Sequence, residues 1–302
     1  MTVLLERIER IIAPDLDRAA SPAVHAVAEA ARRPWGRGIL AILFYGSCLR
    51  SGDDEGKLVD LYLVAESYQS VHRHRLPRLL NRLVPPNVYY VETPFEGRTV
   101  RAKYALVSLE QLARLVEPQT ENPYFWARFA QPTGILWTRD GEAAARLRRV
   151  LAQAVASMAA AARPLAGAEP TPRRLWVEAL AQTYATELRS EPEGKGNELF
   201  DHAPERWEAL GRLLLESLPV PGKEEEGAAR ARWRRRRRNG KLWSIARLVK
   251  AAFTFQGGAD YLVWKIERHS GVRMELTPWQ RRHPVLAAPV LYLKYRRLGA
   301  FR

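Results

Sequence analysis

A Gly-Ser turn and an aspartate stand close to each other in the first part of the chain. The apolar run 39–45 ends in Gly46-Ser47, and Asp60 lies inside a second apolar run, residues 58–64. A glycine in such a turn allows backbone N–H groups to approach phosphates, and the serine hydroxyl adds a donor. An acid on the following strand can hold a divalent cation against the same phosphates. The pattern therefore predicts a nucleotide-transferring site.

The second metal-binding acid of such a site is not at its usual place. Two residues after Asp60, on the same face of the strand, the chain has Tyr62. We predict that Asp60 and Glu92 bind Mg²⁺, because Glu92 extends the apolar run 88–91, which we expect beside the Asp60 strand. An acid of the loop 53–55 is the alternative ligand.

Basic residues nearby could neutralise bound phosphates. Arg101 and Lys103 share one face of the expected strand 100–107, and Arg128 follows later. Arg101 and Arg128 are predicted to bind the phosphate of the acceptor. The residues assigned to catalysis are Asp60, Ser47 and Lys103, and those assigned to the nucleotide are Tyr45, Gly46 and Ser47. The alternative to a functional site is an ordinary turn beside the solvated face of a sheet.

The expected elements change character near residue 139. Apolar runs and turn signals predict strands and helices before that point. Beyond it the apolar spacing is helical throughout, with candidate helices at 140–162, 171–189 and 204–217. We predict an α+β protein, with a nucleotidyltransferase-like mixed-sheet domain at 1–139 and an all-helical domain at 140–302.

The composition points to an anionic partner. The 302 residues carry 48 Lys and Arg against 33 Asp and Glu, a net charge of +15, which favours nucleic acid, nucleotides or acidic lipid surfaces. The single Cys48 excludes a disulfide framework or a multi-cysteine metal cluster. The uncharged stretch 151–162 is too short to cross a bilayer.

Two basic segments are predicted to lie on an anionic membrane surface. The arginine run 230–238, which contains Trp233, continues into 241–250, and together they fit a basic amphipathic helix. The apolar stretch within 285–302 is flanked by cations and fits the same interface. A solvated charge run, or an RNA-binding segment, would have the same composition.

Several short motifs, taken together, resemble one known family. Residues 88–93, Val-Tyr-Tyr-Val-Glu-Thr, and 97–109, which contain Lys103-Tyr104, are similar to a core motif of the mitochondrial translocator assembly and maintenance proteins. The turn 45–48 and the strand 59–61 resemble that family too, and the family likewise lacks the second acid. The similarity covers residues 38–135. This chain departs from the pattern at Cys48 and Ala127, where the family has glycine, and at Gln131, where it has lysine.

That family comprises phosphatidate cytidylyltransferases of nucleotidyltransferase fold. The resemblance implies that the chain makes CDP-diacylglycerol and pyrophosphate from CTP and phosphatidic acid, with Mg²⁺, as a peripheral protein on the cytoplasmic face of a membrane. The attacking phosphate is already anionic near neutral pH, so no general base is required. Two other interpretations stay open: nucleotide transfer to RNA or a small molecule, and a non-catalytic membrane or RNA binder on a degenerate fold.

Overall fold

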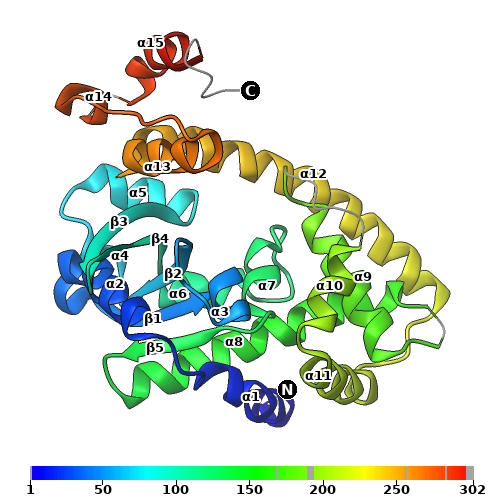
Figure 1. Cartoon of the computed structure of the whole chain (residues 1–302). Coiled ribbons are helices and arrows are strands. Elements are labelled where there is room, and N and C mark those ends of the chain that lie inside the picture. Colours follow the sequence, from blue (N-terminus) through cyan, green and yellow to red (C-terminus); the bar gives the residue numbers. More distant parts are fainter. Residues whose placement is uncertain (1, 168, 189–193, 256, 283, 297–302) are drawn as a thin grey trace.

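The computed structural model describes residues 2–167, 169–188, 194–255, 257–282 and 284–296 (Figure 1). The fold is α+β, as predicted, and contains a five-stranded mixed sheet in the order β3-β4-β2-β1-β5. Neighbouring strands are antiparallel except β2 and β4, which are parallel. The strands are β1 (Ile39–Tyr45), β2 (Leu58–Ala65), β3 (Asn87–Phe95), β4 (Arg98–Ser108) and β5 (Gly134–Thr138). The sequence pattern did not indicate β5, which is short and mostly half-buried.

One face of the sheet is covered by helices α2 (Pro22–Arg32) and α4 (Tyr68–Val71). Ser21 caps α2, since its Oγ accepts a hydrogen bond from the backbone of Val24. Alternate residues of the strands, such as Leu61 and Leu63, join the apolar side chains of α2 in one core cluster.

The opposite face carries Asp60 and is covered by α1 (Thr2–Leu16), α6 (Leu109–Leu115), α7 (Tyr124–Phe129) and α8 (Gly141–Ala162). The predicted boundary at residue 139 falls between β5 and Asp140, whose carboxylate caps α8 at 2.7 Å from the Ala143 nitrogen. Helix α1, however, packs on α8 and on α11 (Pro204–Ser217). The two predicted domains therefore share one hydrophobic core.

The helical half is held by buried tryptophans. The Trp176 indole, on α9 (Pro172–Tyr184), donates to the carbonyl of Trp207 on α11 at 2.9 Å, and the two rings lie 4.7 Å apart. Helix α10 (Lys195–Asp201) packs against α9. The shorter or more peripheral helices are η1 (Arg33–Gly38), α3 (Ser47–Ser51), α5 (Arg75–Leu83), η2 (Arg163–Leu165), α13 (Gly258–Ser270), α14 (Pro278–Arg282) and α15 (Pro284–Arg296).

Helix α12 (Lys223–Thr254) runs from the helical half to the region of α13 (Figure 1). The arginine run 230–238 of this helix is not uniformly exposed. Trp233 is fully buried and donates to the Ala161 carbonyl at 2.9 Å, while Arg236 donates to the carbonyls of Thr120 and Pro118. Within the segment 230–250, Trp233 therefore belongs to the core, where its ring packs beside Trp126. None of the described helices combines the length and apolarity needed to cross a bilayer.

The docking of α12 is tested by the substitution Trp233→Ala. Removing this fully buried indole is expected to lower the free energy of unfolding by about 3–5 kcal/mol, measured by urea denaturation. The matched control is Trp243→Ala on the same helix, where the indole is 36% exposed and the expected change is much smaller. Equal losses in the two variants would contradict the buried position of Trp233.

Candidate functional site

The Gly-Ser turn lies directly against Asp60. Strands β1 and β2 pair with Tyr45 opposite Asp60, so the turn that follows β1 meets the carboxylate. Gly46 has φ +88°, and a Cβ at this position would lie 3.0 Å from Asp60 Oδ2. Only glycine allows this backbone conformation and this close approach together.

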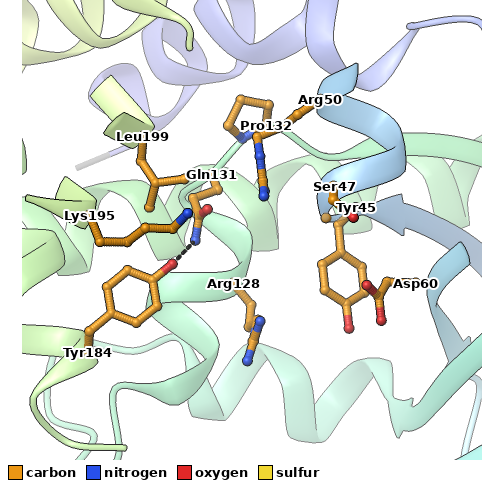
Figure 2. Close-up of a pocket in the computed structure, with 11 residues that line it drawn as sticks. Tyr45, Ser47, Arg50, Asp60, Arg128, Gln131, Pro132, Tyr184, Lys195 and Leu199 are labelled. Carbon is orange, nitrogen blue, oxygen red and sulfur yellow. Dashed lines mark hydrogen bonds between the residues drawn. The ribbon is translucent and has the colours of Figure 1, made fainter. Parts of the chain in front are cut away.

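The predicted nucleotide residues line one polar cavity of about 250 Å³ (Figure 2). Five predicted site residues contribute to its wall: Tyr45, Gly46, Ser47, Asp60 and Arg128. Lys103 adjoins it, because β4 pairs with β2 in a register that places Lys103 opposite Asp60, and its Nζ lies 3.4 Å from Asp60 Oδ1. The structure thus brings together six of the eight predicted residues.

The other two predicted residues, Glu92 and Arg101, lie elsewhere. Strand β4 separates β3 from β2, so the expectation that the Glu92 strand lies beside Asp60 is wrong. Glu92 pairs instead with Arg101, whose Nε is 3.0 Å from its carboxylate. Both line a second cavity, of about 480 Å³, between β3 and α13.

The loop acids do not complete the site either. Asp53 forms an ion pair with Lys57 at 2.6 Å, and Asp54 forms one with Arg98 at 2.7 Å. None of the loop acids, Glu55 included, lines the cavity that contains Asp60. Among the residues that the structure describes, no group of three or more His, Cys, Asp or Glu could enclose a metal ion.

Asp60 nevertheless fits the way in which Mg²⁺ is usually held beside a nucleotide. This ion keeps several waters and commonly takes only one or two protein carboxylates, its other ligands being substrate phosphates. The Asp60 carboxylate is about one-quarter exposed, and it opens into the same cavity as Ser47. A single carboxylate at the edge of a cavity therefore suits a Mg²⁺ ion that is bound together with a polyphosphate. It does not suit an ion enclosed by protein ligands alone.

Sequence reasoning missed one wall of the cavity. The residues not assigned to the site are Arg50, Gln131, Pro132, Tyr184, Lys195 and Leu199. Figure 2 shows Lys195 and Tyr184 across from Asp60, with Gln131 donating to the Tyr184 hydroxyl at 3.1 Å. Arg50 lies one helical turn after the Gly-Ser turn, so its position near the site could have been predicted from the local sequence. The position of Lys195 could not, because Lys195 reaches the cavity only through the packing of α10 against α9.

An aromatic cluster with two guanidinium groups lies beside Asp60, on the same side of the sheet. The rings of Tyr45 and Tyr62 are 5.2 Å apart, and the hydroxyls of Tyr62 and Tyr124 are 3.3 Å apart. The guanidinium groups of Arg128 and, from α12, Arg247 lie over the Tyr124 ring at 5.1 and 4.1 Å. Burial, reinforced by the charge of Asp60, raises the pKa of the Tyr45 phenol. Tyr45 is therefore a neutral hydrogen-bonding group beside the carboxylate.

Comparison with protein-family models and with curated proteins gave no match for this chain. The cavity is lined by the Asp60 carboxylate and by cations from three elements, Arg50 on α3, Arg128 on α7 and Lys195 on α10. Arg128 also lies 3.7 Å from the Glu187 carboxylate, and Lys195 donates to Glu198 at 2.6 Å. Such a set suits a polyanion that carries a divalent cation.

The close approach at Gly46 is tested by comparing Gly46→Ala with Gly52→Ala. Both glycines have positive φ, but a Cβ at Gly52 would meet nothing within 4 Å. We expect Gly52→Ala to lose about 1–2 kcal/mol of stability from backbone strain, and Gly46→Ala to lose at least about 1 kcal/mol more. Chemical denaturation measures both, and similar losses would show that the turn tolerates a side chain beside Asp60.

Proposed function

We propose that this chain is a phosphatidate cytidylyltransferase, which converts CTP and phosphatidic acid into CDP-diacylglycerol and pyrophosphate. The observation that carries the proposal is the meeting of the Gly46-Ser47 turn with Asp60 in one cation-rich cavity. The choice of phosphatidic acid as the acceptor rests on the resemblance of residues 38–135 to the translocator assembly and maintenance family. No observation favours RNA as the acceptor over this lipid.

The reaction joins two anions and needs no proton acceptor. One oxygen of the phosphatidate monoester forms a bond to the α-phosphorus of CTP, and the bond between that phosphorus and the bridging β-oxygen breaks. The electron pair stays on pyrophosphate as it leaves. Because the attacking oxygen is already anionic near neutral pH, the main tasks of the protein are charge neutralisation and alignment.

The residues on the two sides of the cavity suit different phosphates. Asp60 would hold Mg²⁺, which when bound supplies positive charge at the α-phosphate. Arg50 and Lys195 are assigned to the β- and γ-phosphates, with the Ser47 hydroxyl as a further donor. Gln131 stands where the resembling family has lysine, and the Lys195 side chain reaches the same part of the cavity (Figure 2). We therefore assign to Lys195 the charge that position 131 lacks.

The acceptor phosphate is assigned to Lys103 on β4 and to Arg128 on α7. Lys103 lies 3.4 Å from Asp60, and Arg128 lines the cavity next to it. Arg101 is withdrawn from this role, because it is paired with Glu92 outside the cavity. A cation beside each anion lowers the repulsion that otherwise opposes their approach.

A lipid acceptor requires contact with a bilayer. Peripheral binding at the cytoplasmic face of an anionic membrane, through 230–250 and 285–302, is part of the proposal. In the second segment, residues 297–302 lie outside the described residues, whereas α15 exposes Leu286, Val290 and Leu293.

The activity is tested with CTP labelled in its cytosine, Mg²⁺ and phosphatidic acid, followed by organic extraction. Wild-type protein is expected to move label into the lipid phase, and Asp60→Asn to reduce the rate at least about a hundredfold, as for loss of one preorganised charged group. Asp53→Asn is the matched control, since Asp53 lies in an ion pair outside the cavity. Label that stays in the aqueous phase with folded wild-type protein would reject the assignment. Label that enters RNA in a parallel reaction supplied with RNA would favour the RNA alternative.

The role of Lys195 is tested by Lys195→Met in the same assay. Loss of one charged hydrogen bond to the triphosphate, about 1.5–3 kcal/mol, is expected to lower kcat/KM for CTP about 10- to 100-fold while the KM for phosphatidic acid changes little. Lys57→Met removes a lysine whose partner is the loop residue Asp53, and it is expected to leave both constants unchanged. A rise in the KM for phosphatidic acid alone would move Lys195 to the acceptor side.

A further inference from the structure

The second half of α12 is oriented with its apolar face toward solvent. Leu242, Ile245, Leu248 and Val249 follow the spacing of a single helix face and are all exposed. The opposite face points into the protein and carries Gly240, Arg247 and Lys250, of which Gly240 and Lys250 are buried. This arrangement is the reverse of an ordinary surface helix, whose apolar stripe covers the core.

Specific contacts fix this orientation of α12. The Arg247 Nε donates to the Pro85 carbonyl at 3.2 Å, and the Lys250 ammonium donates to the carbonyls of Pro86, at 2.6 Å, and of Val84. The Arg247 guanidinium also stacks on Tyr124. Turning the apolar face inward would break these bonds and leave buried polar groups unpaired, which is costly.

Helix α5 adds a second exposed apolar face next to the first. Leu76, Leu79 and Leu83 recur at helical spacing, and all are more than half exposed. Helix α5 ends at Leu83, immediately before the carbonyls at 84–86 that bind Arg247 and Lys250. The exposed end of α5 therefore lies beside the turn of α12 that exposes Leu248 and Val249.

The charged residues within the two segments that carry the apolar faces have one sign. Neither 67–91 nor 227–259 contains an aspartate or a glutamate. Exposed cations flank the leucines, namely Arg75, Arg82, Arg238 and Lys241. A second copy of the same surface would bring cations against cations, and RNA would leave the leucines in water. An apolar surface with a cationic rim is complementary to an anionic bilayer.

We infer that the outer face of α12, residues 242–249, and the exposed face of α5, residues 76–83, together form a surface that inserts into the interfacial region of an anionic phospholipid bilayer. The contact is thus made by leucines of both halves of the chain, and the inward-facing part of the arginine run serves to dock α12. Bilayer binding is independent of catalysis, whereas its use in delivering phosphatidic acid rests on the proposed function. The same helix turn that would touch lipid carries Arg247 to the aromatic cluster beside Asp60.

Flotation of the full chain with vesicles tests this surface. The vesicles are phosphatidylcholine alone, or phosphatidylcholine mixed with phosphatidylglycerol. We expect the wild type to float with the anionic vesicles and to be released by added salt. Leu242→Glu and Leu79→Glu, at side chains 60% and 51% exposed, should each weaken the binding constant for the vesicles at least about tenfold, as expected for removing one leucine from an apolar environment.

The matched control is Val220→Glu, where the valine is 78% exposed outside the surface and flotation should be unchanged. Circular dichroism and thermal melting establish that each variant is folded, and the two leucines lie on separate helices, so either variant alone suffices. Wild-type protein that fails to float, or leucine variants that float like the wild type, would overturn the inference. So would a wild-type dimer that Leu242→Glu converts to a monomer without any effect on flotation.

Activity on a short-chain phosphatidic acid dispersed in detergent separates this inference from the proposed function. If both hold, Leu242→Glu keeps wild-type activity on the dispersed acceptor and loses activity on vesicles. Wild-type protein that floats but forms no CDP-diacylglycerol would reject the proposed function and leave the membrane surface standing.

Discussion

The candidate site depends on one backbone constraint, the antiparallel pairing of β1 with β2 that sets Tyr45 opposite Asp60. The backbone hydrogen bonds between two antiparallel strands fix the position of the carboxylate relative to the turn. Gly46 then lets the chain reverse without a side chain between turn and acid. A shift of β2 by one residue would turn the Asp60 side chain to the face where Val59, Leu61 and Leu63 are now buried, so the apolar core opposes loss of this geometry.

The cations that face Asp60 come from elements far apart in the sequence. Arg50 belongs to the helix after the turn, Arg128 to α7 and Lys195 to α10, which is held in place through α9 and its tryptophan contact with α11. Because these groups stand on separate packed helices, the backbone need not rearrange when a ligand arrives, and Lys195 would exchange its ion pair with Glu198 for a ligand phosphate. Preorganised charge of this kind is what phosphoryl-type transfers require of a protein.

Sequence reasoning succeeded where the information was local. The apolar runs predicted four of the five strands, and the short spacing from turn to acid placed Gly46, Ser47 and Asp60 at one site. It failed for Glu92, because no short segment of sequence determines the order of strands in a sheet. In the structure β4 lies between the Glu92 strand and the Asp60 strand. For α12, helical spacing alone indicated an amphipathic helix but could not tell which face turns inward. That choice is made by carbonyls at 84–86, which are remote in sequence.

The shared core has a consequence for how the chain can be divided. Leu43 and Tyr62 on the sheet, Ile8 and Ile12 on α1 and Leu147 on α8 belong to one continuous apolar cluster. A fragment ending at residue 139 would strip α8 from the sheet and leave that cluster open to water. The α/β half and the helical half should accordingly melt in a single cooperative transition. The boundary that the sequence pattern indicates near residue 139 separates two kinds of secondary structure, not two units that fold on their own.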